Sequence, residues 1–407
     1  MVNILNYNDT QKLIFISCII YLFCPLFGIV VLLVSILSGN NNKRLLFYFF
    51  ILLALYMGLI NSTKIPVTDQ AMYYEAYKLV PNRSLWENLT GIYGTHGKMT
   101  TKEMGFGLLN VIGYYITFGS YPLFITLFTF ILYMLYYYAI YNWFKFLNIR
   151  KVTLYIVSAV ITLTFFTQFF NLTIHLQRQM IATAVIIFSI IQTIVKGKIQ
   201  WLWVLIAISL HTSVGLFLPL FVIIFFIKKI TRKLIIIILG GFAVLISVLN
   251  YIATSLLNSL GGDIYALNRL QSMGNSQEDA MATGLVMLVS LPLAFISIKD
   301  ILTKEKCYDN NSIILYLFYL FNIIFSIFNP DNTMQYRYFM MSYGFIPFIL
   351  PLLSWKINFG EKIYLLIIPV FFFFRFYFTF EQITFRYAPI EYVLLGNVFT
   401  LFNYNYI

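Results

Sequence analysis

Apolar runs long enough to cross a bilayer recur along this chain, and they constrain its fold more than any motif does. The first covers residues 13–37 and the last residues 363–380. A spanning helix needs about 20 predominantly apolar residues, because the hydrocarbon core is about 30 Å thick. Hydrophobic residues make up 60% of the chain and charged residues 10%, and the mean hydropathy is +0.83. This excludes a soluble domain and predicts an all-α polytopic membrane protein.

Lysines and arginines mark the loops expected on the cytoplasmic side, since short cytoplasmic loops carry the positive charge. Six clusters occur: Lys43-Arg44, Lys145 with Arg150-Lys151, Lys196 with Lys198, 228–233, 299–306, and Lys356 with Lys362. Consecutive clusters on the same side must be separated by an even number of crossings. This predicts about ten full spans plus two partial helices. They would form one integral membrane domain, 1–407, with both termini outside. Most acids then fall outside, so the net charge of +12 follows from topology and requires no nucleic acid.

Two stretches fit the requirement for even numbers of crossings only if they are partial helices. Residues 105–119 are short and glycine-rich, which favours an interfacial half-helix on the outer face. Residues 201–226 are one apolar run between basic clusters that must share a side, which favours a re-entrant helical hairpin broken at 211–213. Residues 13–37 and 153–172 are each predicted as one continuous span.

The longest polar interval, residues 61–104, is predicted as the main outer loop, and 256–283 as a second one. Within the first, Asp69, Tyr73 and Tyr77 recur every fourth residue and would share one face of a helix. Such a face offers a carboxylate and two aromatic platforms to a sugar. In the alternative reading, Asp69 caps a surface helix and the tyrosines pack on the protein beneath it.

Arginines at the outer ends of the spans are candidate receptors for a diphosphate, because a guanidinium can bind two oxygens at once. They are Arg178, Arg337, Arg375 and Arg386. The alternative for each one alone is snorkelling to the headgroups.

Two acids and one histidine are candidate general acid–base groups. Asp69 and Glu103 are outer-loop carboxylates that could deprotonate a sugar hydroxyl, and a solvated acid is the alternative. His211 coincides with the predicted hairpin break, and a hydrogen-bonded structural histidine is the alternative. The only adjacent outer acids are Glu278-Asp279, and the three cysteines lack metal-ligand spacing, so neither a metal nor a cofactor is predicted.

Short motifs in a fixed order resemble the EpsG family, the Wzy-like bacterial O-antigen and exopolysaccharide polymerases. They run in order as Asp69 with Tyr73, Tyr74 and Tyr77, Glu103-Met104-Gly105-Phe106, Leu108-Leu109-Asn110, Arg178-Gln179 with Ala182, His211-Thr212-Ser213, Arg337-Tyr338, Tyr387-Ala388-Pro389 and Glu391-Tyr392. The resemblance implies a fold similar to the GT-C glycosyltransferases. It also implies an inner-membrane glycosyltransferase that extends undecaprenyl-diphosphate-linked O-antigen, capsule or exopolysaccharide units on the periplasmic face.

The resemblance also implies roles for individual residues. Arg178, Arg337 and Arg386 would hold the diphosphate; Asp69, Glu103 and His211 would serve catalysis; and Tyr73, Tyr77, Gln179 and Tyr338 would contact the sugars. The expected partners are the lipid-linked glycan, membrane lipid, a chain-length regulator and a flippase.

Three alternative functions remain open. A flippase or secondary transporter for lipid-linked sugars would also show many spans and broken helices, although it should carry an internal repeat, and none is evident. An O-antigen ligase differs only in its acceptor. A membrane acyltransferase is disfavoured because the cytoplasmic loops are short and hold no histidine.

Overall fold

The computed structural model describes residues 7–39, 42–67, 69–94, 97–100, 103–227, 231–259, 277–302, 312–328, 332–354, 363–380 and 387–404. The chain divides into two compact units. The first comprises Met1–Phe188, Trp201–Gly215 and Leu365–Ile407, and the second comprises Ser189–Gln200 and Leu216–Tyr364. Each is described by itself.

The first unit is helical except for one short hairpin. Its elements are α1 (Tyr7–Phe23), α2 (Pro25–Leu37), α3 (Lys43–Ser62), α4 (Asp69–Lys78), η1 (Val80–Asn82), α5 (Leu85–Thr90), β1 (Gly91–Gly94), β2 (Gly97–Thr100), α6 (Met104–Ile116), α7 (Tyr121–Phe146), α8 (Val152–Thr164), α9 (Thr167–His175), most of α10 (Gln177–Lys196), α11 (Trp201–Leu210), α20 (Ile368–Thr379), α21 (Ile390–Leu395) and α22 (Val398–Phe402). β1 and β2 pair antiparallel with Gly91 opposite Thr100. The all-α prediction therefore needs this one correction, inside the predicted outer loop.

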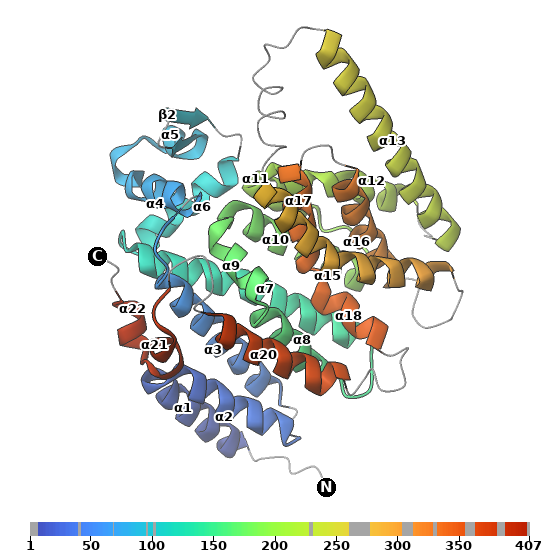
Figure 1. Ribbon diagram of the computed structural model, residues 1–407. Helices are drawn as coiled ribbons and strands as arrows, with labels where there is room; N and C mark the ends of the chain where they lie inside the picture. The colour runs from blue at the N-terminus through green and yellow to red at the C-terminus, as the bar shows by residue number, and fades with distance from the viewer. Residues whose placement is uncertain are drawn as a thin grey trace. The chain divides into compact units, whose positions relative to one another are not determined.

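Helices α3 and α7 form the centre of the first unit and lie side by side (Figure 1). Aromatic packing contributes to this contact, since the rings of Phe50 and Tyr137 lie 5.4 Å apart. Within the described residues, three helices are long and apolar enough to cross a membrane: α3, α7 and α10. Helices α8 and α9, bent by 59° from each other, would together make a fourth span. The predicted count of about ten full spans remains a prediction.

The prediction of one continuous helix over residues 13–37 is wrong. The run breaks at Cys24, and α1 and α2 lie side by side (Figure 1). Proline at the first position of a helix lacks only an N–H that would be free there, so Pro25 starts α2 without cost. Gly28 permits the close approach, because a Cβ there would lie 2.7 Å from the Ser17 carbonyl oxygen.

This pairing also brings the start of α1 close to the start of α3. Thr10 accepts a hydrogen bond of 3.4 Å from Asn42, the residue that precedes α3. The start of α1 therefore lies at the basic Lys43 end of α3, so the single crossing predicted between them is not observed. Residues 1–6 lie outside the described residues.

The predicted span 153–172 is likewise interrupted, at Phe165-Phe166 between α8 and α9. Tertiary packing accounts for the break, since no proline or glycine lies there. The ring of Phe165 lies 5.0 Å from that of Phe373, and the ring of Phe166 lies 5.3 Å from that of Phe372. Both partners belong to α20.

The second unit is also helical. It contains α12 (Leu218–Phe226), α13 (Arg232–Ser259), α15 (Gln277–Leu302), α16 (Ser312–Ile327), α17 (Asn332–Tyr343) and α18 (Ile346–Ser354), while η2 (Thr212–Phe217) and the π-helix η3 (Ile363–Ile367) join the units. Helix α16 packs on α13, α15 and α17. The centre of the predicted second outer loop, residues 260–276, lies outside the described residues.

Candidate functional site

Glu103 lies at the centre of a buried charged cluster in the first unit. Its carboxylate accepts hydrogen bonds from Nδ1 of His211, from the backbone N–H of Thr212 at 3.1 Å and from Nη1 of Arg178 at 2.5 Å. The Thr212 hydroxyl lies 3.4 Å from the carboxylate oxygen that accepts from its own backbone N–H. Glu103 is only 6% exposed. Buried charges require partners of this kind, so two separate segments, residues 211–212 and the start of α10, satisfy the carboxylate.

Local breaks in the helices produce this arrangement. Glu103 occupies the N-cap position of α6, and α11 ends at Leu210, just before His211. The helical bonding of α11 ends with the His211 N–H, which donates to the Ala207 carbonyl. The next N–H, that of Thr212, has left the α-helical pattern and donates to Glu103 instead.

Arg178 reaches Glu103 from the start of α10. Its Nε donates to the Tyr73 hydroxyl at 3.3 Å, and its guanidinium lies 5.6 Å from the centre of that ring. The side chain of Arg178 remains 22% exposed. Tyr73 itself is 3% exposed and packs edge-on against Phe106 of α6 at 5.4 Å. The guanidinium is therefore oriented by both Glu103 and Tyr73.

The electrostatics keep Glu103 ionised. Burial acts to raise the pKa of this carboxyl, but the His211 hydrogen bond, the charges of His211 and Arg178, and the Thr212 N–H together lower that pKa from 4.5 to about 2. An ionised carboxylate only accepts hydrogen bonds, so we assign the proton of the shared contact to Nδ1 of His211. In the neutral imidazole, Nε2 then carries a lone pair and can accept a proton.

A second polar layer lies near the Ser62 end of α3. Asn61 donates to Thr129 at 3.2 Å and to Thr173 at 3.0 Å, and the Tyr387 hydroxyl lies 3.5 Å from its Oδ1. Lys64, which is 3% exposed, lies 5.8 Å from the centre of the Tyr387 ring. Burial lowers the pKa of Lys64 to about 7. Neither Asn61 nor Lys64 was predicted as a site residue from the sequence, although Asn61 is the first residue of the predicted outer loop and Lys64 lies within it.

The structure places the predicted helix of the outer loop at α4, which begins at Asp69. Asp69 is half-buried, and its predicted role remains a prediction. Tyr77 is 1% exposed; its ring packs against Tyr114, Tyr121 and Phe124, and its hydroxyl lies 2.5 Å from that of Thr117. The packing of Tyr73 and Tyr77 agrees with the alternative in which these tyrosines cover the protein beneath α4. Gln179 is also buried, at 2% exposure.

Three further predicted site residues belong to the second unit or lie outside the described residues. Arg337 and Tyr338 lie in α17 of the second unit, where the Tyr338 ring packs edge-on against Phe325 at 4.7 Å. Arg386 lies outside the described residues. The hydrogen bonds from Thr212 to Glu103 and from Arg178 to the Tyr73 hydroxyl were not predicted, although Thr212 and Tyr73 both belong to the motifs named above. In the described part of the chain, no three His, Cys, Asp or Glu side chains form a group suited to a metal ion.

These features define a helical membrane protein with a buried Glu–His–Arg cluster at one end of its spans. The sequence matches the model of the EpsG family over residues 46–393, most of the chain. The chain belongs to the EpsG family, a Wzy-like polymerase family associated with polysaccharide biosynthesis. No curated protein and no solved structure matches the chain.

Proposed function

We propose that this protein is a glycosyltransferase of GT-C-like architecture that polymerises lipid-linked oligosaccharide repeat units. It would move a growing glycan from undecaprenyl diphosphate onto the next lipid-linked unit at the periplasmic face of the bacterial inner membrane. The observation that carries the proposal is the Glu103 carboxylate bound by His211, Thr212 and Arg178. Membership of the EpsG family supports a substrate used in polysaccharide biosynthesis.

His211 is the general base of the proposed reaction. A hydroxyl of the acceptor sugar attacks the anomeric carbon of the donor, forming the new C–O bond as the bond to the diphosphate oxygen breaks. The hydroxyl proton passes to Nε2 of His211, and undecaprenyl diphosphate leaves with the bonding electron pair. Glu103 holds Nδ1–H, so it fixes the tautomer and stabilises the imidazolium that forms.

The charge of the cluster suits this step. The proposed base acts as a neutral imidazole, and in that state the charges of Glu103 and Arg178 neutralise each other. After proton uptake the cluster carries one positive charge. Among the described residues, Nη2 of Arg178 has no partner. It would bind the negatively charged leaving group, and Glu103 and Tyr73 already hold the guanidinium in position. This electrostatic change favours diphosphate departure at the moment when the proton moves.

The remaining predicted residues complete the proposal. Arg337 and Arg386 would bind the diphosphate with Arg178, and Asp69, Gln179 and Tyr338 would contact the sugars. Tyr73 would act through Arg178, since its hydroxyl accepts from Nε. A chain-length regulator and a flippase are the proposed partners.

The test is the surface-glycan ladder of a strain lacking this gene, complemented with wild type, Arg178→Ala or His211→Gln. We expect the deletion to collapse the ladder to core plus a single repeat unit. Neither variant should restore it at normal membrane levels. The matched control is His175→Gln, a histidine of α9 outside the cluster, which should restore the full ladder.

Other outcomes would assign another function. Loss of the single repeat unit as well would indicate a flippase or an O-antigen ligase. An unchanged ladder in the deletion strain would reject the proposed function. A ladder fully restored by His211→Gln would keep the polymerase but reject His211 as its base.

A further inference from the structure

A pocket with two lysines lies at the ends of α2, α3, α7 and α8. It has a volume of about 240 Å³. Lys43 and Lys145 line it with the polar Asn42 and Thr153, and Leu46 and Ile156 contribute apolar side chains. Both lysines are exposed. The pocket therefore combines accessible ammonium groups with an apolar wall.

This pocket lies at the far end of the helices from the Glu103 cluster. The Tyr121 hydroxyl, at the start of α7, accepts a hydrogen bond of 3.2 Å from Gln177, the neighbour of Arg178. Lys145 lies at the other end of α7. A helix of this length extends about 39 Å at 1.5 Å per residue. The lysine pocket is thus separated from the proposed active site by the thickness of a membrane.

The surroundings of the pocket are strongly basic. The segments that carry it hold Lys43, Arg44, Lys145, Arg150 and Lys151 and no acid. Helix α1, which reaches this end through Thr10, adds one acid and one base, Asp9 and Lys12. Among the described residues, Lys43 and Lys145 form no ion pair; the Lys145 ammonium lies 4.7 Å from the centre of the Tyr141 ring. The site is therefore suited to an anion.

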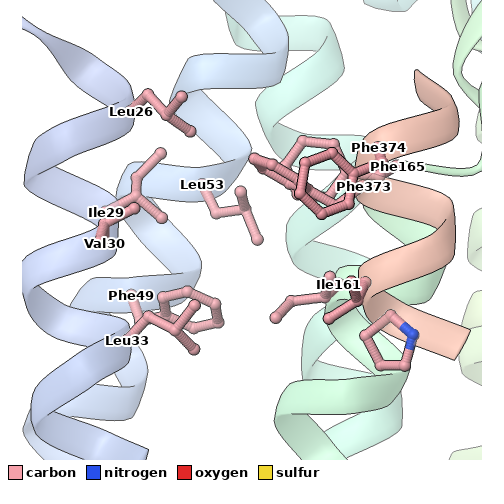
Figure 2. Close-up of a pocket in the computed structure, with 12 residues that line it drawn as sticks. Leu26, Ile29, Val30, Leu33, Phe49, Leu53, Ile161, Phe165, Phe373 and Phe374 are labelled. Carbon is pink, nitrogen blue, oxygen red and sulfur yellow. The ribbon is translucent and has the colours of Figure 1, made fainter. Parts of the chain in front are cut away.

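An apolar cavity of about 280 Å³ lies in the same unit between α2 and α3 on one side and α8 and α20 on the other (Figure 2). Only apolar side chains line it. Figure 2 shows Leu26, Ile29 and Leu33 facing Phe165, Phe373 and Ile161 across the gap. Val370 and Phe374, at its edge, are 52% and 54% exposed, so the cavity is open to the bilayer.

The two pockets follow each other along the same helices. On α2 the lining passes from Leu33 to Ile36, and on α3 from Phe49 to Leu46. These steps of three residues correspond to about 5 Å each. On α8 the lining passes from Ile161 to Ile156 in the same direction. An elongated ligand with an anionic head and an apolar chain would fit both.

We propose that the two pockets form one binding site for an anionic phospholipid of the bilayer. Its phosphate would lie between Lys43 and Lys145, and one acyl chain would occupy the apolar cavity. Basic pockets between spanning helices bind anionic headgroups in this way. The position favours a bilayer lipid over the substrate, because a substrate diphosphate must reach the opposite end of α7. The bound lipid would link α2 and α3 to α8 and α20.

The test is native mass spectrometry of the purified full chain titrated with dioleoylphosphatidylglycerol or dioleoylphosphatidylcholine. We expect the wild type to prefer phosphatidylglycerol. The double variant Lys43→Gln/Lys145→Gln should bind it about 25-fold more weakly, since each basic residue near an anionic headgroup contributes about fivefold. The control Lys196→Gln/Lys198→Gln removes the same charge from exposed lysines outside the pocket and should retain wild-type binding.

A second pair of variants tests the chain cavity. Leu33→Phe fills the cavity and should weaken binding of both lipids, whereas Leu37→Phe, at a 52% exposed position outside it, should not. The proposal would be overturned if the two double lysine variants lost phosphatidylglycerol binding equally, or if the wild type bound the two lipids equally. Displacement of phosphatidylglycerol by equimolar polyprenyl phosphate would assign the site to the substrate lipid instead. Every readout is binding and is independent of polymerase activity.

Discussion

The ionised state of Glu103 determines how the cluster responds to acid. Because its folded-state pKa is lowered from 4.5 to about 2, the ionised carboxylate stabilises the fold fully above pH 4.5 and loses this effect as pH falls toward 2. We therefore expect the difference in Tm between wild type and Glu103→Gln to stay constant from pH 8 to pH 5 and to shrink below pH 4.5. Thermal unfolding in detergent measures it. A difference that already shrinks between pH 7 and pH 5 would contradict the assigned ionisation.

Arg178 and Glu103 should be coupled energetically, because each leaves the other as a buried unpaired charge. We expect Arg178→Gln or Glu103→Gln alone to destabilise the protein by about 3 kcal/mol. The double variant should lose at least about 1 kcal/mol less than the sum of the single variants. Chemical unfolding of all four proteins in one detergent completes the cycle. Additive losses would show that the contact of 2.5 Å contributes no pairwise stability.

The close approach of α6 to α11 brings Glu103 to His211. A Cβ at Gly105 would lie 2.3 Å from Oγ of Ser209 and 2.8 Å from its carbonyl carbon, so Gly105→Ala must push the helices apart. We expect a cost of about 1–3 kcal/mol and at least a tenfold loss of ladder formation. Gly105→Ala/Ser209→Ala should recover only part, since the backbone contact remains. The control Gly240→Ala, in a helix with no atom within 4 Å of the added Cβ, should be tolerated. Full recovery in the double variant would contradict the backbone clash.

Helix boundaries could be predicted where composition or charge marks them. The break at His211 follows from an apolar run too short for two crossings between like-charged loops, and the structure ends α11 at Leu210. The start of α6 follows from its glycines after a polar loop. The break at Phe165-Phe166 could not be predicted, because it depends on rings of α20 some 200 residues away; the nearby contact of Ser158 with Leu365 spans 207 residues. Pro25 is a sequence signal for the break after α1, and the prediction of one helix over residues 13–37 did not use it.

The members of the cluster could be selected from the sequence, but their contacts could not. Glu103 and Arg178 are charged groups beside apolar runs, and His211 interrupts one, which marks all three as costly to bury. Their pairings span 75 and 108 residues, and no local period records such a distance. For Tyr73 and Tyr77, the spacing correctly placed both on one face of α4. It gave no information on the aromatic residues of α6 and α7 that cover them.

The two ends of the first unit should lie on opposite sides of the membrane. Trp86, 64% exposed, belongs to the loop region that leads to Glu103, and Arg150 is exposed in the turn after α7, beside the lysine pocket. Since short basic loops remain cytoplasmic, we expect Trp86→Cys to react with a membrane-impermeant maleimide on spheroplasts and Arg150→Cys to react only after permeabilisation. The native Cys18, Cys24 and Cys307 are first replaced by serine, and this parent serves as the unlabelled control. Labelling of Arg150→Cys alone on intact spheroplasts would invert the orientation and place the Glu103 cluster at the cytoplasmic face. A periplasmic glycan acceptor could not then reach His211, so this labelling experiment also tests the proposed reaction.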